Sequence, residues 1–438
     1  MKKYLALLLV LVMVLSLAAC ASKPAETTDE PEQTTTEPAP AEETKDEEPA
    51  PAEETKEEEP TEEPADNTEY AVAMITDYGD ITDQSFNQTT YEACKAFCED
   101  NGVEFSYFKP AGDNTADRVA MIEKAVDEGY NVIVMPGYAF GGAIVEAAPE
   151  FPDVKFIALD VAKGDLLEAG VAKAGESYDY NPDNWDLEKY VDMSNVYCAI
   201  YQEELCGYMA GYAAVKLGYK NLGFLGGMSV PAVVRYGYGF VQGVDAAAAD
   251  LGLTDVKLNY IYGGQFFGDA DITAVMDTWY QGGTEVVFAC GGGIYTSAVD
   301  AAKKVGAKVI GVDVDQAGVI ANYAGVDGMT VTSAMKGLYP ATYDTLTDVI
   351  VNGNWEKYVG KIETLGLVSG TDPEANYVQI PMGDGTQWSD SFTQDDYKAM
   401  VKDMFDGKIT VSNNTSSDVS AADFATVITV DDQGSIKG

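Results

Sequence analysis

The fold is decided by the stretch Ile75-Thr76-Asp77-Tyr78-Gly79-Asp80-Ile81-Thr82-Asp83-Gln84-Ser85-Phe86-Asn87. An apolar, β-prone run at 70–74 precedes it, and residues 91–98 follow it with apolar side chains at helical spacing. The stretch therefore predicts a strand, a polar loop and a helix, with the Ser85 hydroxyl capping the helix start. Three carboxylates, an aromatic ring and a carboxamide gather where a parallel strand ends, and open α/β sheets bind ligands at that edge. An ordinary acidic surface loop is the competing interpretation.

From residue 69 onward, strand and helix patterns alternate. The first set of strands is expected at 70–77, 103–108, 132–135 and 155–159, and the pattern restarts with strands at 222–227, 256–262, 285–289 and 308–312. This alternation predicts an α/β fold with doubly wound parallel sheets in two lobes, whose carboxyl edges face each other across a ligand cleft.

The boundaries of the folded part follow from the same pattern. We expect a bilobal domain at 69–412, with lobe 1 at about 69–201, lobe 2 at about 221–331, and later segments crossing between the lobes. Residues 161–192 are polar and aromatic and interrupt the alternation, so they are expected to form an insertion or a long loop. Residues 413–438 are expected to form a C-terminal extension.

Composition excludes several classes of function. The chain has 438 residues, a net charge of −45 and no histidine. The acidic balance makes nucleic acid a poor partner, because affinity for it comes from clustered lysine and arginine. The lack of histidine excludes Ser-His-Asp and Cys-His nucleophile pairs and histidine-based zinc sites. The cysteines show no CxxC spacing, so we expect no metal and no cofactor, and Cys198, Cys206 and Cys290 are predicted to be small core residues.

The N-terminus has the features of an export signal. Lys2 and Lys3 precede an apolar run that ends in Leu17-Ala18-Ala19-Cys20, which is typical of a secretory signal peptide over residues 1–20. The ending resembles a bacterial lipobox, so Cys20 is expected to carry lipid and to anchor the protein on the extracytoplasmic face of the cell membrane. Residues 21–68 are rich in proline, glutamate, threonine and alanine, and predict a disordered acidic tether.

Several motifs together carry a family resemblance. They are Thr76-Asp77, Asp83-Gln84-Ser85-Phe86-Asn87, Gly311-Val312-Asp313-Val314-Asp315-Gln316, Ser333 and Lys336. Over residues 69–412 the chain resembles the basic membrane protein family, whose members are substrate-binding lipoproteins of ABC transporters and include purine nucleoside receptors. The resemblance implies lobes of the type I periplasmic-binding-protein kind, a nucleoside ligand, no catalytic residue, and an ABC permease and ATPase as partners of a monomeric receptor.

The resemblance also assigns roles to the candidate site residues. It makes Asp77 and Asp160, at two strand ends, ligand contacts. It places Phe86 against the base, as a stacking surface, while the Asn87 carboxamide can both accept from and donate to the base edge. A hydrophobic contact at the helix start and a surface amide are the competing interpretations for these two residues.

Asp313 and Lys336 come from the second half of the chain. A carboxylate accepts hydroxyl groups and a nearby ammonium keeps it ionised, so the pair fits a ribose, although a plain salt bridge between them is the alternative. Phe288 is expected to be a second stacking ring, with Tyr295 as its competitor. Asp80, Asp83 and Asp315 are expected to cap loops or to be solvated.

Other functions stay open at this point. The same fold could bind a sugar or another small polar molecule. Asp77, Asp80 and Asp83 loosely resemble the acidic calcium loop of nucleoside hydrolases, in which a metal-bound water attacks the sugar. A signalling or adhesion role without transport is a further alternative.

Overall fold

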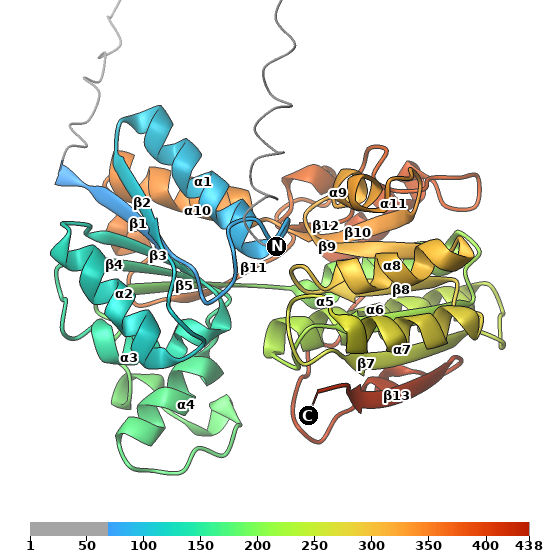
Figure 1. The fold of residues 1–438 in the computed structure, drawn as a ribbon, viewed down its shortest axis with the longest axis horizontal. Helices are drawn as coiled ribbons and strands as arrows, with labels where there is room; N and C mark the ends of the chain where they lie inside the picture. Colours follow the sequence, from blue (N-terminus) through green and yellow to red (C-terminus); the bar gives the residue numbers. More distant parts are fainter. Residues whose placement is uncertain (1–68, 438) are drawn as a thin grey trace, which may run out of the picture. The chain divides into compact units, whose positions relative to one another are not determined.

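The computed structural model describes residues 69–437 as two lobes, each built on a parallel sheet (Figure 1). The signal peptide, Cys20 and the tether expected at 1–68 therefore lie outside the described residues. None of the helices within 69–437 combines the length and apolar character needed to cross a bilayer. The predicted α/β fold with two parallel-sheet lobes is confirmed.

Lobe 1 contains a sheet with the strand order β11-β5-β4-β3-β1-β2, in which every pairing is parallel. Its strands are β1 (Ala71–Ile75), β2 (Glu104–Phe108), β3 (Val132–Pro136), β4 (Lys155–Leu159), β5 (Val196–Tyr201) and β11 (Ile362–Leu365). Its helices are α1 (Phe86–Asn101), α2 (Thr115–Asp127), α3 (Gly141–Ala147), α4 (Lys163–Lys173) and α10 (Leu338–Leu346).

Alternating side chains of β1 show how this sheet is covered on both faces. Val72 and Met74 belong to the same buried cluster as Phe97 of α1, whereas Ala73 and Ile75 pack into a second cluster with Ile122 of α2. The expectation of an insertion or a long loop at 161–192 is corrected in part, because residues 163–173 form α4, which packs against α3 through buried Leu166, while residues 174–192 contain only short 3-10 turns.

Lobe 2 contains a sheet with the strand order β12-β10-β9-β8-β6-β7-β13, in which only β12 runs antiparallel to its neighbour. Its strands are β6 (Asn221–Gly226), β7 (Lys257–Tyr262), β8 (Val286–Cys290), β9 (Lys308–Asp313), β10 (Thr330–Lys336), β12 (Val378–Gln379) and β13 (Thr429–Ser435). Its helices are α5 (Glu203–Lys216), α6 (Pro231–Asp250), α7 (Ala270–Gln281), α8 (Tyr295–Val305), α9 (Ala317–Ala324) and α11 (Gln394–Phe405).

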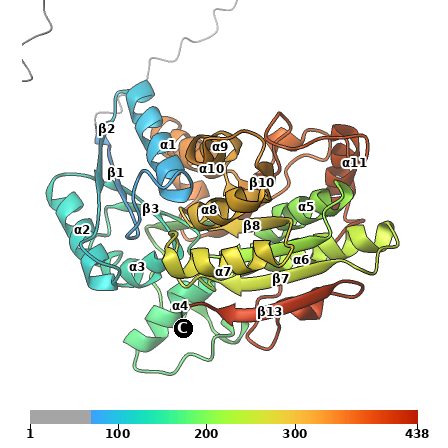
Figure 2. The same cartoon turned by 45° about the vertical axis from the view of Figure 1, so that its right-hand side comes forward.

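Residues 413–438 are not an extension outside the bilobal domain, as was expected, since β13 pairs with β7 and completes the edge of the lobe 2 sheet (Figures 1 and 2). The Asp245 carboxylate of α6 fixes the approach to this strand. It accepts hydrogen bonds from the backbone N–H groups of Thr426, Val427 and Ile428 at 2.7–3.2 Å, and from the Thr426 hydroxyl at 2.6 Å.

The two lobes repeat one arrangement. The order β5-β4-β3-β1-β2 in lobe 1 corresponds to β10-β9-β8-β6-β7 in lobe 2. Gly137 after β3 and Gly291 after β8 both have positive φ, at 126° and 142°. Asp160 follows β4 and Asp313 ends β9, and both have left-handed backbones with φ of 60° and 64°. The repeat therefore places equivalent residues at the facing carboxyl edges of the two sheets.

Helices α5 and α6 pack closely because glycines face the partner backbone on both sides. A Cβ at Gly207 would lie 2.3 Å from the Tyr236 carbonyl oxygen, and one at Gly239 would lie 2.1 Å from the Glu204 carbonyl oxygen. The glycines at 207 and 211 thus serve close helix packing, and α5 belongs to lobe 2.

Three chain crossings join the lobes, and backbone hydrogen bonds tie them together. The chain crosses after β5, after β10 and after β11. At these points the N–H groups of Gln202, Gly337 and Tyr377 donate to the carbonyl oxygens of Leu365, Tyr377 and Gly366 at 2.7–3.0 Å. The crossings consequently form one hydrogen-bonded hinge.

Candidate functional site

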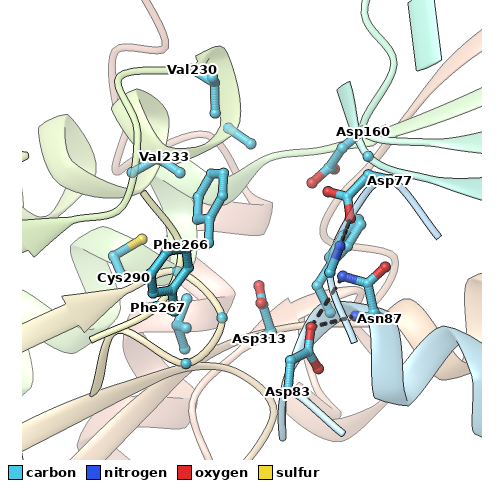
Figure 3. A pocket seen from close by; sticks show the side chains of 18 of the residues that line it. Asp77, Asp83, Asn87, Asp160, Val230, Val233, Phe266, Phe267, Cys290 and Asp313 are labelled. Atoms are coloured by element: carbon cyan, nitrogen blue, oxygen red, sulfur yellow. Dashed lines mark hydrogen bonds between the residues drawn. The ribbon is translucent and has the colours of Figure 1, made fainter. Parts of the chain in front are cut away.

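A cavity of about 460 Å³ lies between the lobes and is lined by residues from both. This volume is within the range of small-molecule binding sites. Figure 3 shows that its two sides differ in chemistry. Asp77, Asp83, Asn87 and Asp160 of lobe 1 form one side, while Val230, Val233, Phe266, Phe267 and Cys290 of lobe 2 form the other, with Asp313 between them.

Asp77 lies directly after β1, and its carboxylate is fixed by the loop that follows it. Its Oδ1 atom accepts hydrogen bonds from the N–H groups of Tyr78 and Gly79 at 2.7 and 2.8 Å. Arg118 supports the same residue by donating from Nε to the Asp77 carbonyl oxygen at 3.1 Å. Burial raises the pKa of Asp77, while the two N–H groups and the Arg118 charge oppose that rise.

Asp83, rather than Ser85, caps helix α1. The Asp83 carboxylate accepts from the N–H groups of Ser85, Asn87 and Gln88 at 2.9–3.1 Å. The prediction that the Ser85 hydroxyl caps the helix is wrong, because that hydroxyl makes no capping bond and instead donates across the lobes to Oδ2 of Asp313 at 2.5 Å. A charged carboxylate two residues earlier satisfies the free N–H groups of the first turn more strongly than a hydroxyl does.

Asn87 lies in the first turn of α1 beside this cap and lines the cavity. Its Nδ2 atom donates to Oδ2 of Asp83 at 3.2 Å. Its buried Oδ1 atom has no hydrogen-bond partner among the described residues, and the same holds for Oδ1 of Asp160. A buried acceptor without a partner is costly, so both atoms suit a ligand that brings N–H or O–H donors.

Lys336 ends β10 and lies among carboxylates from both lobes. Its Nζ atom forms an ion pair with Asp160 and lies 3.5 Å from Glu203 and 3.8 Å from Asp313. Burial alone would lower the pKa of Lys336, but these three carboxylates raise it above its ordinary value, so the side chain is an ammonium ion. The ammonium also lies 4.7 Å from the centre of the Phe86 ring, a cation–π contact at the cavity wall.

Asp313 is held by several donors at the centre of the cavity. In addition to the Ser85 bond, the Tyr236 hydroxyl donates to its Oδ1 atom at 3.3 Å. Burial raises the pKa of Asp313, and the Lys336 charge and the Ser85 bond oppose the rise. The alternative of a plain Lys336–Asp313 salt bridge is thereby replaced by a network, in which Asp160 is the nearest partner of Lys336.

The prediction that Phe288 of lobe 2 is a second stacking ring is wrong. Phe288 does not line the cavity; it has 0% exposure and packs against Phe224 and Phe240 in the core. Its position on β8 explains this, because Phe288 faces helices α5 and α6 and lies two residues before the strand ends. Tyr295 does not line the cavity either, and its ring contacts Tyr323.

Phe266 and Phe267, in the loop after β7, are the lobe 2 rings that reach the cavity. Phe266 lies against glycines that follow two neighbouring strands of the lobe 2 sheet, β6 and β8, since a Cβ at Gly227 or Gly291 would come within 2.3 or 2.7 Å of its ring. Phe267 is 55% exposed. The signal that could have found them is the sequence Gly264-Gln265-Phe266-Phe267-Gly268, a pair of aromatic residues between glycines directly after a strand.

Asp80 in the first loop and Asp315 after β9 both bond locally. Asp80 pairs with Lys109 at 2.6 Å, and Asp315 accepts from the Ala317 N–H at 3.0 Å at the start of α9, in line with the expected loop roles. Within residues 69–437 no group of three or more cysteine, aspartate or glutamate side chains is arranged to hold a metal ion.

Comparison with known proteins connects this geometry to a family. Residues 70–371 match the family model Bmp, described as ABC transporter substrate-binding protein PnrA-like. The chain is 26% identical over 361 residues to the ABC transporter nucleoside-binding protein BmpA of Lactococcus lactis, covering 78% of this chain and 89% of that protein. It is 25% identical over 321 residues to Basic membrane protein B of Borreliella burgdorferi, covering 70% of this chain and 83% of that protein.

Solved structures agree in fold. A solute-binding protein of an ABC transporter system from Aeropyrum pernix aligns with a TM-score of 0.56 at 20% identity, covering 79% of this chain and 88% of that one. A second one, from Conexibacter woesei, gives a TM-score of 0.56 at 20% identity and covers 78% and 99% of the two chains. The two-lobed architecture is therefore that of type I solute-binding proteins.

Proposed function

The chain belongs to the Bmp family of PnrA-like ABC transporter substrate-binding proteins, and from this premise we propose that it binds a nucleoside between its lobes and delivers it to an ABC permease. Proteins of this family bind substrates for transport and are not enzymes, and their transport partners are a permease and an ATPase. The proposal therefore concerns the ligand, the residues that hold it and the place where the protein works.

The observation that carries the nucleoside proposal is the unequal chemistry of the two cavity sides. A nucleoside has a flat aromatic base with N–H groups at its edge and a ribose with several hydroxyls. The apolar side of lobe 2 offers Phe266 as a surface for the flat face, and the ring of Phe86 lies on the lobe 1 side. The carboxylates and Asn87 of lobe 1 offer acceptors for the N–H and O–H groups.

We assign the ribose to the carboxylates beside Lys336. Asp160 has an oxygen without a partner among the described residues, and Asp313 lies at the centre of the cavity. Lys336 lies beside both side chains, and carboxylates beside an ammonium are strong acceptors for vicinal hydroxyls. Asp77 and Asn87 are left for the base edge, where a carboxylate accepts and a carboxamide both accepts and donates.

The net charge of the cavity disfavours an anionic ligand. Its lining includes Asp77, Asp80, Asp83, Asp160 and Asp313 against the single ammonium of Lys336. An anionic group placed among these carboxylates would be repelled and would lose its hydration. The lining thus favours ligands rich in donors and without negative charge.

Closure of the lobes would follow from contact with both of them. A ligand that touches Phe266 on one lobe and Asp77 and Asn87 on the other binds the closed state better than the open one and shifts the population toward it. A permease that recognises the closed receptor would then receive the ligand from it. Lipid on Cys20 would keep the receptor at the extracytoplasmic membrane surface, within reach of that permease.

Titration calorimetry with inosine, guanosine and adenosine tests the proposal directly. Saturable binding of at least one of them supports it, and the absence of heat with all three, on protein whose circular dichroism shows a folded α/β domain, rejects it. Ribose serves as the control, because retention of full affinity for ribose alone would identify a sugar receptor on the same fold. Membrane partitioning of the Cys20→Ser variant, compared with the unchanged chain, tests the anchor.

A further inference from the structure

Several polar residues of the family motifs do not line the cavity. Among them are Gln84 and Ser85 of the first loop, Gln316 after β9, and Ser333 of β10. Ser85, Gln316 and Ser333 have 0% exposure. Buried polar groups persist in folded proteins when they are hydrogen-bonded, so their partners indicate their role.

The partners lie across the lobe boundary. The Ser85 hydroxyl of lobe 1 donates to Oδ2 of Asp313 in lobe 2 at 2.5 Å. The Gln316 side chain of lobe 2 donates from Nε2 to the Gln84 carbonyl oxygen of lobe 1 at 3.1 Å. The first bond ends on Asp313, which lines the cavity, whereas the second joins two residues that do not line it.

The lobe 2 half of this contact is fixed within its own lobe. Oε1 of Gln316 accepts from the Val312 N–H at 3.0 Å, and the Gln316 N–H donates to the Ser333 hydroxyl at 3.1 Å. Gly311 allows this packing, because a Cβ there would lie 2.6 Å from Oγ of Ser333 and 2.8 Å from Cβ of Gln316. Nε2 of Gln316 is consequently held in position before it meets lobe 1.

The lobe 1 half depends on an unusual backbone. Gln84 has φ of 58°, a left-handed conformation that is unfavourable for a residue with a side chain. Its N–H and its Nε2 atom both donate to Oε1 of Gln88, at 3.1 and 2.8 Å, which holds this turn in place. Among residues 69–437 the non-glycine residues with positive φ are Gln84, Asp160, Asp313 and Tyr180, and the first three contact the opposite lobe.

A separate contact between the lobes involves Met228. The hydroxyls of Tyr78 and Tyr138 in lobe 1 both lie 3.7 Å from its sulfur atom in lobe 2, within the range of a weak hydrogen bond. Direct contacts between the lobes are thus not confined to one pair of residues.

We propose that Gln84 and Ser85 form, with Asp313 and Gln316, a latch that holds the lobes together before a ligand arrives. Ser85 acts as a positioning residue, since it fixes the carboxylate of Asp313 inside the cavity. The latch rests on the receptor role of this protein, but not on the identity of its ligand. Because apparent affinity depends on the fraction of molecules in the binding-competent state, a latch that populates the closed state strengthens binding of any ligand that prefers closed lobes.

The test measures lobe separation without ligand. Spin labels at Glu99→Cys on α1 and Lys304→Cys on α8, both exposed, report the distance across the cleft. A Cys20→Ser background leaves only cysteines that are buried. Ser85→Ala removes the hydroxyl, and Gln316→Met removes the side-chain donor while keeping its length. Thr90→Val is the matched control, because it also removes one hydroxyl near the start of α1. Among residues 69–437 of the unchanged protein, the Thr90 hydroxyl donates only to the Phe86 carbonyl oxygen, at 3.0 Å, and makes no hydrogen bond to lobe 2.

We expect a short distance in the ligand-free protein and in Thr90→Val, and a shift toward longer distances in Ser85→Ala and in Gln316→Met. Affinity for inosine, used as the probe, should fall about tenfold in both latch variants, the size expected for loss of one buried hydrogen bond to a charged or well-ordered group. Gln316→Met gives an independent readout if Ser85→Ala fails to fold.

Two results would overturn the latch. One is an open ligand-free protein whose distances do not change in either variant. The other is tighter binding by Ser85→Ala, which would mean that Ser85 only blocks Asp313. A shift in distance without binding of inosine, guanosine or adenosine would keep the latch and reject the nucleoside, so the two proposals fail separately.

Discussion

Asp160 and Asp313 occupy equivalent places in the two lobes, and both face the ammonium group of Lys336. Each residue lies at the carboxyl end of its strand with a left-handed backbone, and each belongs to a different lobe. Lys336 forms an ion pair with Asp160 and lies 3.8 Å from Asp313. One cation therefore neutralises carboxylates that the closed lobes bring together.

Lys336→Met should destabilise the protein by about 3–5 kcal/mol at neutral pH, since it leaves Asp160, Glu203 and Asp313 buried near one another without this cation. Burial already raises the pKa of Asp313, and loss of the ammonium raises it further. A carboxyl group with a raised folded-state pKa favours folding below its unfolded pKa, and this contribution is lost as pH rises toward the folded value. The loss of stability should accordingly be larger at pH 8 than at pH 5.

Urea unfolding of the variant at these two pH values measures the effect. Lys124→Met is the matched control, because Lys124 is exposed and its contact with Glu128 is 3.9 Å long. An equal loss of stability in the control, or a loss in Lys336→Met that does not change with pH, would contradict the prediction.

Glu204→Gln should stabilise the protein above neutral pH. Glu204 is 2% exposed, and burial, together with the neighbouring Glu203 charge, raises its pKa to about 7. The folded state holds this proton up to about pH 7, whereas the unfolded chain releases it near pH 4, so wild-type stability falls as pH rises between these values. The neutral amide removes that loss, and we expect a gain of about 1–2 kcal/mol at pH 8 and little change at pH 5.

Denaturant unfolding between pH 4 and 8 checks this expectation. Glu99→Gln on the exposed face of α1 is the control and should give the same pH profile as the wild type. A Glu204→Gln variant that is less stable than wild type at pH 8 would show that the Glu204 carboxylate is needed in its charged form.

Phe266→Ala should weaken nucleoside binding by about 1–3 kcal/mol, the usual contribution of an aromatic ring stacked on a base. Phe288→Leu is its matched control, because Phe288 is also an aromatic residue of lobe 2 but lies in the core. That variant should lower the unfolding free energy by about 1 kcal/mol and leave affinity unchanged. Calorimetry and urea unfolding of both proteins separate ligand stacking from core packing. Loss of affinity in Phe288→Leu but not in Phe266→Ala would contradict the assignment of Phe266 to the ligand and Phe288 to the core.

Asp245→Ala should release the C-terminal strand. The Asp245 carboxylate holds three consecutive N–H groups and one hydroxyl at residues 426–428, and its loss should cost about 2–3 kcal/mol. Burial raises the pKa of Asp245, but these bonds hold it below its ordinary value, so its contribution is present above the unfolded pKa and disappears as pH falls through the folded one.

Hydrogen exchange at residues 426–436 is the measurement for this variant. The amides of β13 should exchange faster, while those of β1 in lobe 1 stay protected. Unchanged protection of β13 would show that its pairing with β7 is sufficient without the side chain.

The sequence was informative about residues at strand ends. Asp77, Asp160 and Asp313 could be placed at strand ends from the strand pattern, whose repeat brings two sheet edges together, and the family resemblance assigned Asp77 and Asp160 to the ligand site. Asn87, Phe86 and Lys336 line the same cavity. Whether a residue lies at the end of a parallel strand is determined by the sequence around it, so it can be predicted without knowing the tertiary structure.

Properties that depend on the opposite lobe or on a distant strand could not be read in this way. The face on which Phe288 lies is set by the pleat of β8 and by the helices that cover it, and Ser85 finds its partner 228 residues away. The segment of β13 contains Asp431, Asp432 and Gly434, which are poor strand formers, and it becomes a strand because β7 offers a free edge.

The return of β11 to the lobe 1 sheet has a consequence for how the chain is made. This sheet takes its outer strand from residues 362–365, after the whole of β6 to β10 has been passed. Synthesis proceeds from the amino end. The lobe 1 sheet therefore lacks its edge strand β11 until most of lobe 2 has been synthesised. That sheet cannot be completed before the lobe 2 strands β6 to β10 have been synthesised. A product truncated before residue 362 lacks β11 of the lobe 1 sheet and β12 and β13 of the lobe 2 sheet.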